Sequence, residues 1–233
     1  MEPIPETDEA LSELERFGDS DLRGDLAEVA ATAKEKIPTL VGLSLTLVAE
    51  QLVLTYVATG LEVAVMDAVQ YVDGGPCVEA VVDDEIVGTD VEDLLDEGRW
   101  QLFAQATAAA GVRSTLSIPF GEEGIVTGGV NLYGGHASSF QGQESELARL
   151  FGGWAPGVVS NADLSFSTRL EAVRSPERLK GQAYVDQAVG LLVSSRGIEA
   201  HVAEERLYRA AAQAGTSVVA LARAIVSAFT GEA

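Results

Sequence analysis

The sequence predicts an α+β domain, with an antiparallel sheet covered by helices, followed by a small all-α domain of three helices. Short runs of strand-forming residues recur between Val41 and Tyr133 and alternate with helical patterns. Beyond Leu164 the strand patterns stop and helical patterns continue. The charge changes at the same place, because residues 1–167 hold 7 Lys and Arg against 29 Asp and Glu, whereas residues 168–233 hold 8 and 7. We therefore expect two unequal domains.

The first expected elements are an acidic leader, a helix and a hairpin. Residues 1–20 hold seven acidic side chains and two prolines, which predicts a mobile leader. Apolar residues at three- and four-residue steps from Leu22 to Lys36 predict an amphipathic helix. The runs Val41 to Val48 and Leu52 to Ala58 are rich in Val, Leu and Thr, and they predict an antiparallel hairpin.

The rest of the first domain, expected over residues 21–163, alternates helices and strands. The glycine-rich cluster from Asp73 to Pro76 ends a helix, and the eight acidic residues between Asp83 and Glu97 indicate a strand edge and a loop. Further helices are expected at Leu61 to Tyr71, Arg99 to Ala110 and Glu144 to Asp163, and a second hairpin at Ser114 to Phe120 and Gly124 to Tyr133.

The C-terminal part predicts a tight helical unit over residues 180–233, with turns at Arg196-Gly197 and Ala214-Gly215. Residues 164–179 are expected to form a connecting helix, either paired with a second chain or simply exposed to solvent. Small residues are expected where the helices approach one another, at Ala188, Gly190, Ala203, Ala210, Ala211 and Ala222. Larger residues are expected to fill the core, at Leu191, Leu192, Ile198, Leu207, Leu221 and Ile225.

Several classes of protein are not supported by the sequence. The single cysteine and two histidines fit no metal-ligand spacing, so neither a metal nor a cofactor is expected. The GxGxxG and GxxxxGK[ST] phosphate loops and the GxSxG nucleophile motif are absent, which disfavours an enzyme. No run approaches the roughly 20 apolar residues that cross a bilayer, and the leader is acidic, so we expect a cytoplasmic protein without a membrane partner.

The C-terminal motifs resemble the ANTAR module in order and spacing. They are Gln187-Ala188-Val189-Gly190-Leu191-Leu192, Arg196-Gly197-Ile198, Ala203 to Leu207 with Ala210-Ala211, and Val218 to Val226. This resemblance implies a compact three-helix unit, usually dimeric when active, that binds paired stem-loops in nascent RNA and prevents a terminator from forming. A homodimer and a stem-loop RNA partner are therefore expected.

The upstream region resembles the GAF domains that precede this module in actinobacterial regulators. The motifs that carry the resemblance are Gly75-Pro76-Cys77, Arg99-Trp100, Gly111-Val112-Arg113-Ser114 and Asn131-Leu132-Tyr133. Such domains usually form a pocket for a small-molecule ligand, which implies a sensor. Its expected lining is Met66, Cys77, Trp100, Phe103 and Tyr133, although these residues could equally be ordinary core.

Cys77 is expected to be an inert thiol rather than a redox sensor. The nearby carboxylates of Asp73 and Glu79 are expected to raise its pKa and so to disfavour the thiolate.

Helix-borne arginines supply the predicted RNA surface, because a guanidinium can hold a phosphate through two parallel hydrogen bonds. Arg178, Lys180, Arg196, Arg206, Arg209 and Arg223 are expected to be available to solvent. The expected RNA-binding set is Lys180, Ala188, Gly190, Arg196, Ala203, Arg206, Arg209 and Ala210. In the alternative interpretation, Arg206 and Arg209 only balance Glu204 and Glu205 on a solvated helix.

One departure from the ANTAR pattern concerns the second helix, where the family usually places an aromatic residue directly after the alanine. Here Ala203 is followed by Glu204, whose carboxylate offers no ring for base stacking and repels phosphate. Tyr208, one turn later, could substitute for that ring or belong to the core.

The leading hypothesis is a signal-responsive transcription antitermination regulator in which the GAF-like sensor controls the RNA-binding module. One alternative is a protein-interaction or dimerisation regulator whose module no longer binds RNA. A third is a free-standing ligand-binding protein.

Overall fold

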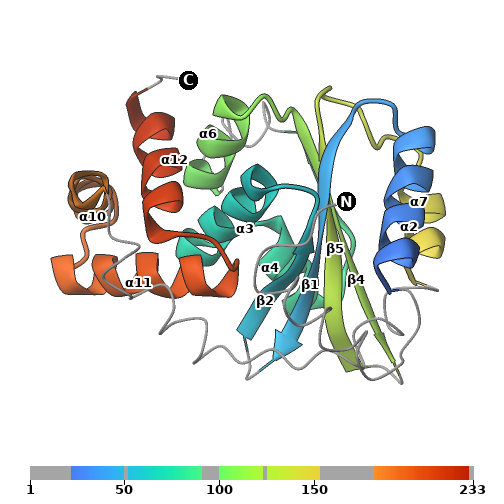
Figure 1. Cartoon of the computed structure of the whole chain (residues 1–233), viewed down its shortest axis with the longest axis horizontal. Helices are drawn as coiled ribbons and strands as arrows, with labels where there is room; N and C mark the ends of the chain where they lie inside the picture. The colour runs from blue at the N-terminus through green and yellow to red at the C-terminus, as the bar shows by residue number, and fades with distance from the viewer. Residues whose placement is uncertain (1–21, 50–51, 91–99, 123–124, 153–180, 231–233) are drawn as a thin grey trace.

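The computed structural model describes residues 22–49, 52–90, 100–122, 125–152 and 181–230 (Figure 1). The expected leader, the connecting helix and Lys180 lie outside these residues. We call residues 22–152 the sheet domain and residues 181–230 the helical domain.

The sheet domain is built on five antiparallel strands in the order β2-β1-β5-β4-β3. Both expected hairpins are confirmed, and β1 pairs with β5 to join them into one sheet. The strands are β1 Leu40–Ala49, β2 Leu52–Ala58, β3 Val87–Asp90, β4 Ser114–Glu122 and β5 Ile125–Gly134. Strands β2 and β3 therefore form the two edges, and β3 provides the edge strand that the acidic segment predicts.

Helices cover both faces of the sheet, as the α+β prediction requires (Figure 1). On one face α2 (Leu22–Lys36) and α7 (Glu144–Gly152) enclose an apolar core that includes Leu45, Leu116 and Phe151. On the other face lie α3 (Leu61–Asp73), α4 (Pro76–Asp83) and α6 (Gln101–Ala109). The part of the expected closing helix beyond Gly152 lies outside the described residues.

Helix α4 was not expected from the sequence, which predicts only a break at Asp73 to Pro76. The break is present, because Gly74 ends α3 with a φ of 88°. The chain then starts a new helix at once, with Pro76 in its first turn, where a missing N–H and a fixed φ favour initiation. Cys77 consequently sits on a helix and not in a loop.

The helical domain consists of α10 (Gln182–Arg196), α11 (Ala200–Gln213) and α12 (Val218–Thr230). Gly197 ends α10 with a φ of 63°, as the expected turn requires. The small residues Ala188, Ala203, Ala210, Ala211 and Ala222 are fully buried, and so are Leu192, Leu207, Leu221 and Ile225. Leu191 and Ile198 are partly buried against the same core.

Gly190 corrects one expectation about helix packing. It is exposed, and nothing lies within 4 Å of the place where a Cβ atom would stand. Gly190 is therefore not a point of close approach between helices of this domain.

The two domains share one hydrophobic core. A single cluster of buried residues runs from Met66 and Val69 on α3 and Phe103 on α6 to Ala211 on α11 and Leu221 on α12. Helix α11 packs against α3, and α12 packs against α3 and α6 (Figure 1). The helical domain is thus docked on the face of the sheet domain that carries α3, α4 and α6.

Candidate functional site

The interior of the sheet domain holds a buried carboxylate surrounded by hydrogen-bond donors. Asp67 of α3 is completely buried and accepts a hydrogen bond of 2.9 Å from the Thr55 hydroxyl on β2. It also accepts hydrogen bonds from the Tyr133 hydroxyl and, at 3.2 Å, from the Asn131 amide, both on β5. The donors come from the sheet and the acceptor from the helix, so this network attaches α3 to β2 and β5.

Burial dominates the ionisation of Asp67. It raises the pKa of the carboxyl to about 6, and the hydrogen bonds from Tyr133, Ser44, Thr55 and Asn131 only partly offset that effect. A carboxyl of this kind changes protonation near neutral pH, well above the usual range for aspartate.

Gln70 connects Cys77 and Tyr133 in this network. Its side-chain oxygen accepts a hydrogen bond of 2.8 Å from the Cys77 backbone N–H, and its amide nitrogen donates to the Tyr133 hydroxyl at 3.1 Å. The ring of Tyr133 is fully buried. The structure therefore brings two of the expected pocket residues together through a glutamine that the sequence did not single out.

Cys77 has a raised pKa, although the cause differs from the one expected. Burial raises the pKa of the thiol to about 12, and the charge of Asp67 adds to that effect. The sequence-based expectation assigned the effect to Asp73 and Glu79, which was wrong because burial and the charge of Asp67, ten positions earlier on α3, raise this pKa.

The other expected pocket residues lie apart from this network. Phe103 is fully buried in the shared core, and Trp100 is partly buried against it at the start of α6. Met66 lines a cleft of about 510 Å³ between α3, α6 and α12, together with Val65 and Arg223. None of the other four expected pocket residues lines this cleft.

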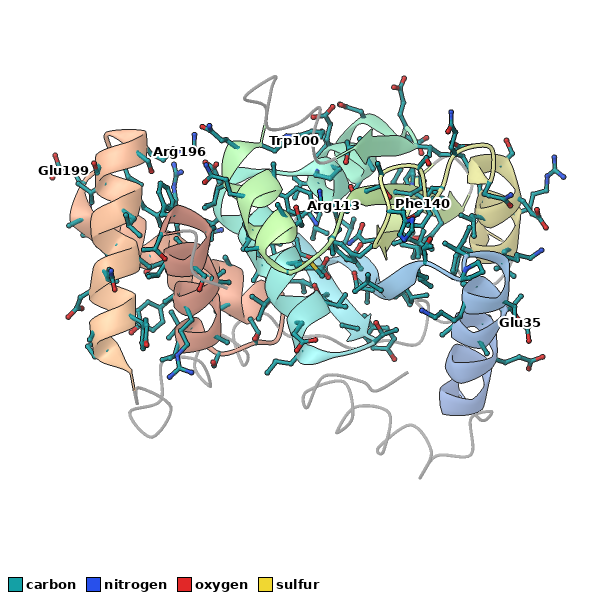
Figure 2. The ribbon with its side chains drawn as sticks, turned by 90° about the horizontal axis from the view of Figure 1, so that it is seen from above. Glu35, Trp100, Arg113, Phe140, Arg196 and Glu199 are labelled. Atoms are coloured by element: carbon teal, nitrogen blue, oxygen red, sulfur yellow. The ribbon has the colours of Figure 1, made fainter. Side chains whose placement is uncertain are left out.

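The junction between the two domains holds specific polar contacts. Arg196, the last residue of α10, forms an ion pair with Asp73, the last residue of α3. Figure 2 shows Arg196 on the side of the helical domain that faces the sheet domain, whereas Glu199 lies on the far side. The Gln213 amide on α11 donates a hydrogen bond of 3.0 Å to the Val53 carbonyl on β2.

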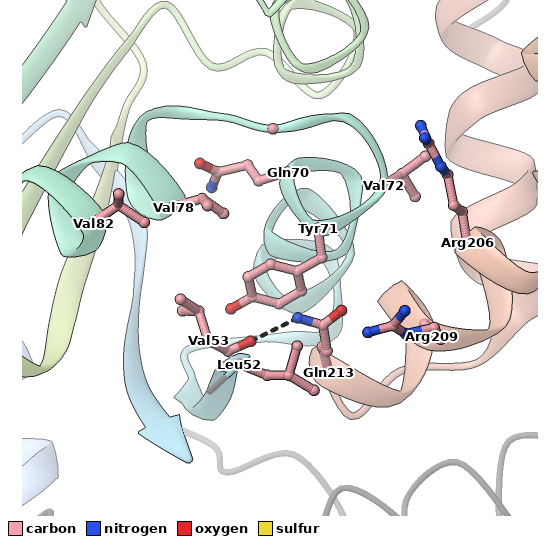
Figure 3. Close-up of a pocket in the computed structure, with 11 residues that line it drawn as sticks. Leu52, Val53, Gln70, Tyr71, Val72, Val78, Val82, Arg206, Arg209 and Gln213 are labelled. Atoms are coloured by element: carbon pink, nitrogen blue, oxygen red, sulfur yellow. Dashed lines mark hydrogen bonds between the residues drawn. The ribbon is translucent and has the colours of Figure 1, made fainter. Parts of the chain in front are cut away.

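Arg206 and Arg209 of α11 also lie at the junction. Both line a cleft bounded by β2, α3 and α4, as Figure 3 shows. Arg206 stands close enough to Asp73 to lower the pKa of that carboxyl, as Arg196 does, while burial has the largest effect and raises it. These arginines are exposed to solvent, as expected, and they also border the sheet domain.

Residues 176–226 match the model of the ANTAR domain family. The C-terminal helical domain is an ANTAR domain. It is preceded here by an α+β domain whose antiparallel sheet is covered by helices on both faces.

Solved structures that are similar to part of this chain include a GAF domain and a reductase. The GAF domain of a two-component sensor histidine kinase from Bacillus halodurans is 14% identical with a TM-score of 0.40, and the match covers 58% of this chain and 94% of that one. The type II free methionine-R-sulfoxide reductase from Thermoplasma acidophilum is 17% identical with a TM-score of 0.44, covering 59% and 92%. No curated protein matches the chain.

The expected RNA-binding residues fall into two groups in the ANTAR domain. Ala188, Ala203 and Ala210 are fully buried and pack the three helices together. Gly190, Arg196, Arg206 and Arg209 are exposed. Glu204 is also exposed, whereas Tyr208 is partly buried against the shared core.

The residues of the junction and the polar network that the sequence did not predict as site residues include Asp67, Gln70, Asp73 and Gln213. A period-3.6 pattern places Asp67 on α3 but cannot show that it faces inwards. A polar residue at a buried helical position is the signal that could have marked Asp67 and Gln213 for attention.

Neither a metal site nor a membrane span is evident in the described part of the chain. Within the described ranges, no group of three or more His, Cys, Asp or Glu side chains could hold a metal ion. No single described helix is long and apolar enough to span a membrane, and the only pair that passes by length and composition, α11 with α12, is bent by 115°.

Proposed function

We propose that this chain is a signal-responsive regulator of transcription antitermination, in which the ANTAR domain binds stem-loop RNA under the control of the GAF-like sheet domain. The observation that carries the proposal is the ANTAR match over residues 176–226 together with three exposed arginines, Arg196, Arg206 and Arg209, on that domain. Arginine is suited to phosphate because its planar fork donates two parallel hydrogen bonds.

Docking of the ANTAR domain restrains this surface. Arg196 is held by Asp73, and Arg206 and Arg209 face the cleft beside α3 and α4. An RNA approaching the docked arginines would also meet the acidic sheet domain, since residues 22–152 carry 20 acidic side chains against 6 basic ones. The docked arrangement is therefore the low-affinity state in our proposal.

A signal received by the sheet domain shifts the equilibrium towards an undocked ANTAR domain. Undocking releases the arginines from the neighbouring sheet domain and exposes the apolar face of α11 and α12. The apolar face is then available for a second copy of the chain, which accounts for the homodimer expected of an active ANTAR protein. The chain acts in this proposal as a cytoplasmic binding protein, not as an enzyme.

The test is an RNA electrophoretic shift with the full chain, a two-stem-loop RNA and an unrelated hairpin at two salt concentrations. The double variant Asp73→Asn/Gln213→Ala weakens docking and is expected to bind the two-stem-loop RNA more tightly than the parent chain. Adding Arg206→Gln and Arg209→Gln to this variant is expected to weaken binding and to reduce the salt slope by about 2, one unit for each lost phosphate contact.

Arg149→Gln is the matched control, because Arg149 is an exposed arginine on α7 at the opposite face of the sheet. The proposal is overturned if the weakened-docking variant does not bind the RNA at low salt.

A second candidate function is favoured by Glu204. Its exposed carboxylate stands where the ANTAR pattern has an aromatic residue. A chain that fails to bind RNA but forms a concentration-dependent dimer in light scattering would be a protein-interaction regulator that keeps its ANTAR domain as a dimerisation element.

A further inference from the structure

A cleft of about 380 Å³ lies between the sheet domain and the ANTAR domain (Figure 3). We call it the junction cleft. Its walls come from β2, α3 and α4 on one side and from α11 on the other, and they include Leu52, Val53, Val78, Val82, Arg206 and Arg209. Its size falls in the range of small-molecule sites, about 300–1,000 Å³.

The junction cleft has an apolar end and a cationic end. Val78 and Val82 project from α4 at one end, whereas Arg206 and Arg209 project from α11 at the other (Figure 3). Val82 is 72% exposed, so the apolar end of the cleft is open to solvent. The two ends thus differ in the chemistry that they can recognise.

The polar groups between the ends are already engaged with the protein. The side chain of Gln70 bonds inwards to Cys77 and Tyr133, and the Gln213 amide bonds to the Val53 carbonyl. The arginines differ, because among the described residues no ion pair is formed by Arg209. Arg206 acts on the Asp73 carboxylate, which is already paired with Arg196. The α11 end of the cleft therefore carries positive charge in excess.

We propose that the junction cleft binds a small monocarboxylate with an apolar body. The carboxylate lies between the guanidinium groups of Arg206 and Arg209, and the apolar body extends over Leu52 and Val53 towards Val78 and Val82. Asp83 and Asp84 directly follow Val82 on the chain and repel a carboxylate from that end, so the direction of binding is fixed.

Such a ligand would contact both domains and so would favour the docked state. It would also occupy the arginines that the proposed function assigns to RNA. This regulatory consequence rests on the proposed function, whereas binding of the ligand itself does not. The carboxylate is expected to lower the affinity of the full chain for RNA and not to raise it.

The experiment is calorimetric titration of the full chain, without RNA, with sodium octanoate and with sodium 3-phenylpropionate. The two probes share the carboxylate and differ in an aliphatic or an aromatic body, so the tighter binder identifies the body that the cleft prefers. Octanamide, which lacks the charge, and acetate, which lacks the body, are each expected to bind at least about tenfold more weakly than the better probe.

The variant Arg206→Gln/Arg209→Gln is expected to lose at least about tenfold in affinity for the better probe, whereas Arg149→Gln keeps the parent affinity. Val82→Asp tests the other end, and it is tolerated by the fold because the side chain is largely exposed. It is expected to weaken binding of octanoate by removing apolar contact and adding a negative charge.

The inference is overturned if neither probe binds saturably below about 5 mM, if octanamide binds as tightly as octanoate, or if the arginine variant binds as the parent does. If the chain binds the carboxylate at this cleft but does not shift RNA, the proposed function is wrong and this inference stands. If the chain binds RNA but not the carboxylate, this inference is wrong and the proposed function stands.

Discussion

Arg196 and Asp73 form an ion pair between the last residue of α10 and the last residue of α3, which are 123 positions apart in the sequence. The side chain of Asp73 is 14% exposed and that of Arg196 is 34% exposed, so the pair is only partly shielded from water. A pair in this position contributes specificity to docking and a modest, salt-sensitive part of its free energy.

Asp73→Asn is expected to loosen docking without unfolding either domain. An exposed ion pair contributes up to about 1 kcal/mol, so the docking equilibrium should shift by up to about fivefold. RNA affinity of the full chain should rise by the same factor at low salt and by less at high salt. Asp83→Asn, which removes an exposed carboxylate on α4, is the control, and an equal rise in that variant would show that only the total charge matters.

Gln213→Leu is expected to lower the free energy of unfolding by about 1–3 kcal/mol. The substitution keeps the size of the side chain but leaves the Val53 carbonyl without the hydrogen bond that Gln213 donates. Urea denaturation followed by circular dichroism measures the loss. A variant as stable as the parent would mean that the contact at the edge of β2 adds nothing to docking.

The Asp67 carboxyl is expected to titrate near pH 6, as detected by carboxyl NMR shifts or infrared difference spectra. Because burial raises its folded-state pKa from 3.8 to about 6, the native state favours the protonated form. The associated stability is fully present below pH 4 and is lost as the pH rises through 6.

A shift of this size corresponds to roughly 3 kcal/mol. The difference in unfolding free energy between the parent chain and Asp67→Asn should therefore fall by about that amount between pH 4 and pH 7. A difference that stays constant over this range would contradict the raised pKa. Asp83→Asn is the control, because it removes the same charge as Asp67→Asn but at an exposed site.

Cys77 is expected to resist alkylation in the folded protein. The thiol is 1% exposed and its pKa is raised to about 12, so the reactive thiolate is both scarce and inaccessible at pH 8. Iodoacetamide labelling followed by mass spectrometry should be slower by at least about 100-fold in buffer than in urea. Because the chain has a single cysteine, no other residue can account for the label.

Gly190→Ala is expected to stabilise the chain and weaken RNA binding. An exposed glycine inside a helix is less favourable than alanine by about 0.8–1.0 kcal/mol, and no neighbour would contact the added methyl group. We expect RNA to approach the backbone of α10 at Gly190, where the missing side chain leaves room for it. Thermal unfolding and the RNA shift assay measure the two effects separately. A stabilised variant with unchanged RNA affinity would remove Gly190 from the binding surface.

Most of the fold could be predicted from the sequence, because the signals involved are local. The period of the apolar residues predicts α2 and α3, the runs of branched residues predict both hairpins, and Gly197 marks the end of α10. Helix α4 was missed because the cluster from Asp73 to Pro76 ends one helix and begins another within three residues. A proline such as Pro76 can either end a helix or start one, and the sequence does not distinguish the two.

The site could be predicted only in part, because its contacts join residues that are far apart in the sequence. A helix pattern shows that Ala210, Ala211 and Leu221 are buried, but it does not distinguish burial against the neighbouring helices, against α3 or against a second chain. The positions of Arg206 and Arg209 depend on that choice. For the same reason the sequence could not show that Asp67, and not Asp73, lies near Cys77.

Strand β2 lies at the edge of the sheet, and its Val53 carbonyl accepts a hydrogen bond from Gln213 of the docked ANTAR domain. An open edge strand is a template for pairing with another chain. In the undocked state of our proposal, that template is uncovered together with the apolar face of α3. We therefore expect the undocked chain to aggregate unless RNA binding or dimerisation follows faster than edge-to-edge association.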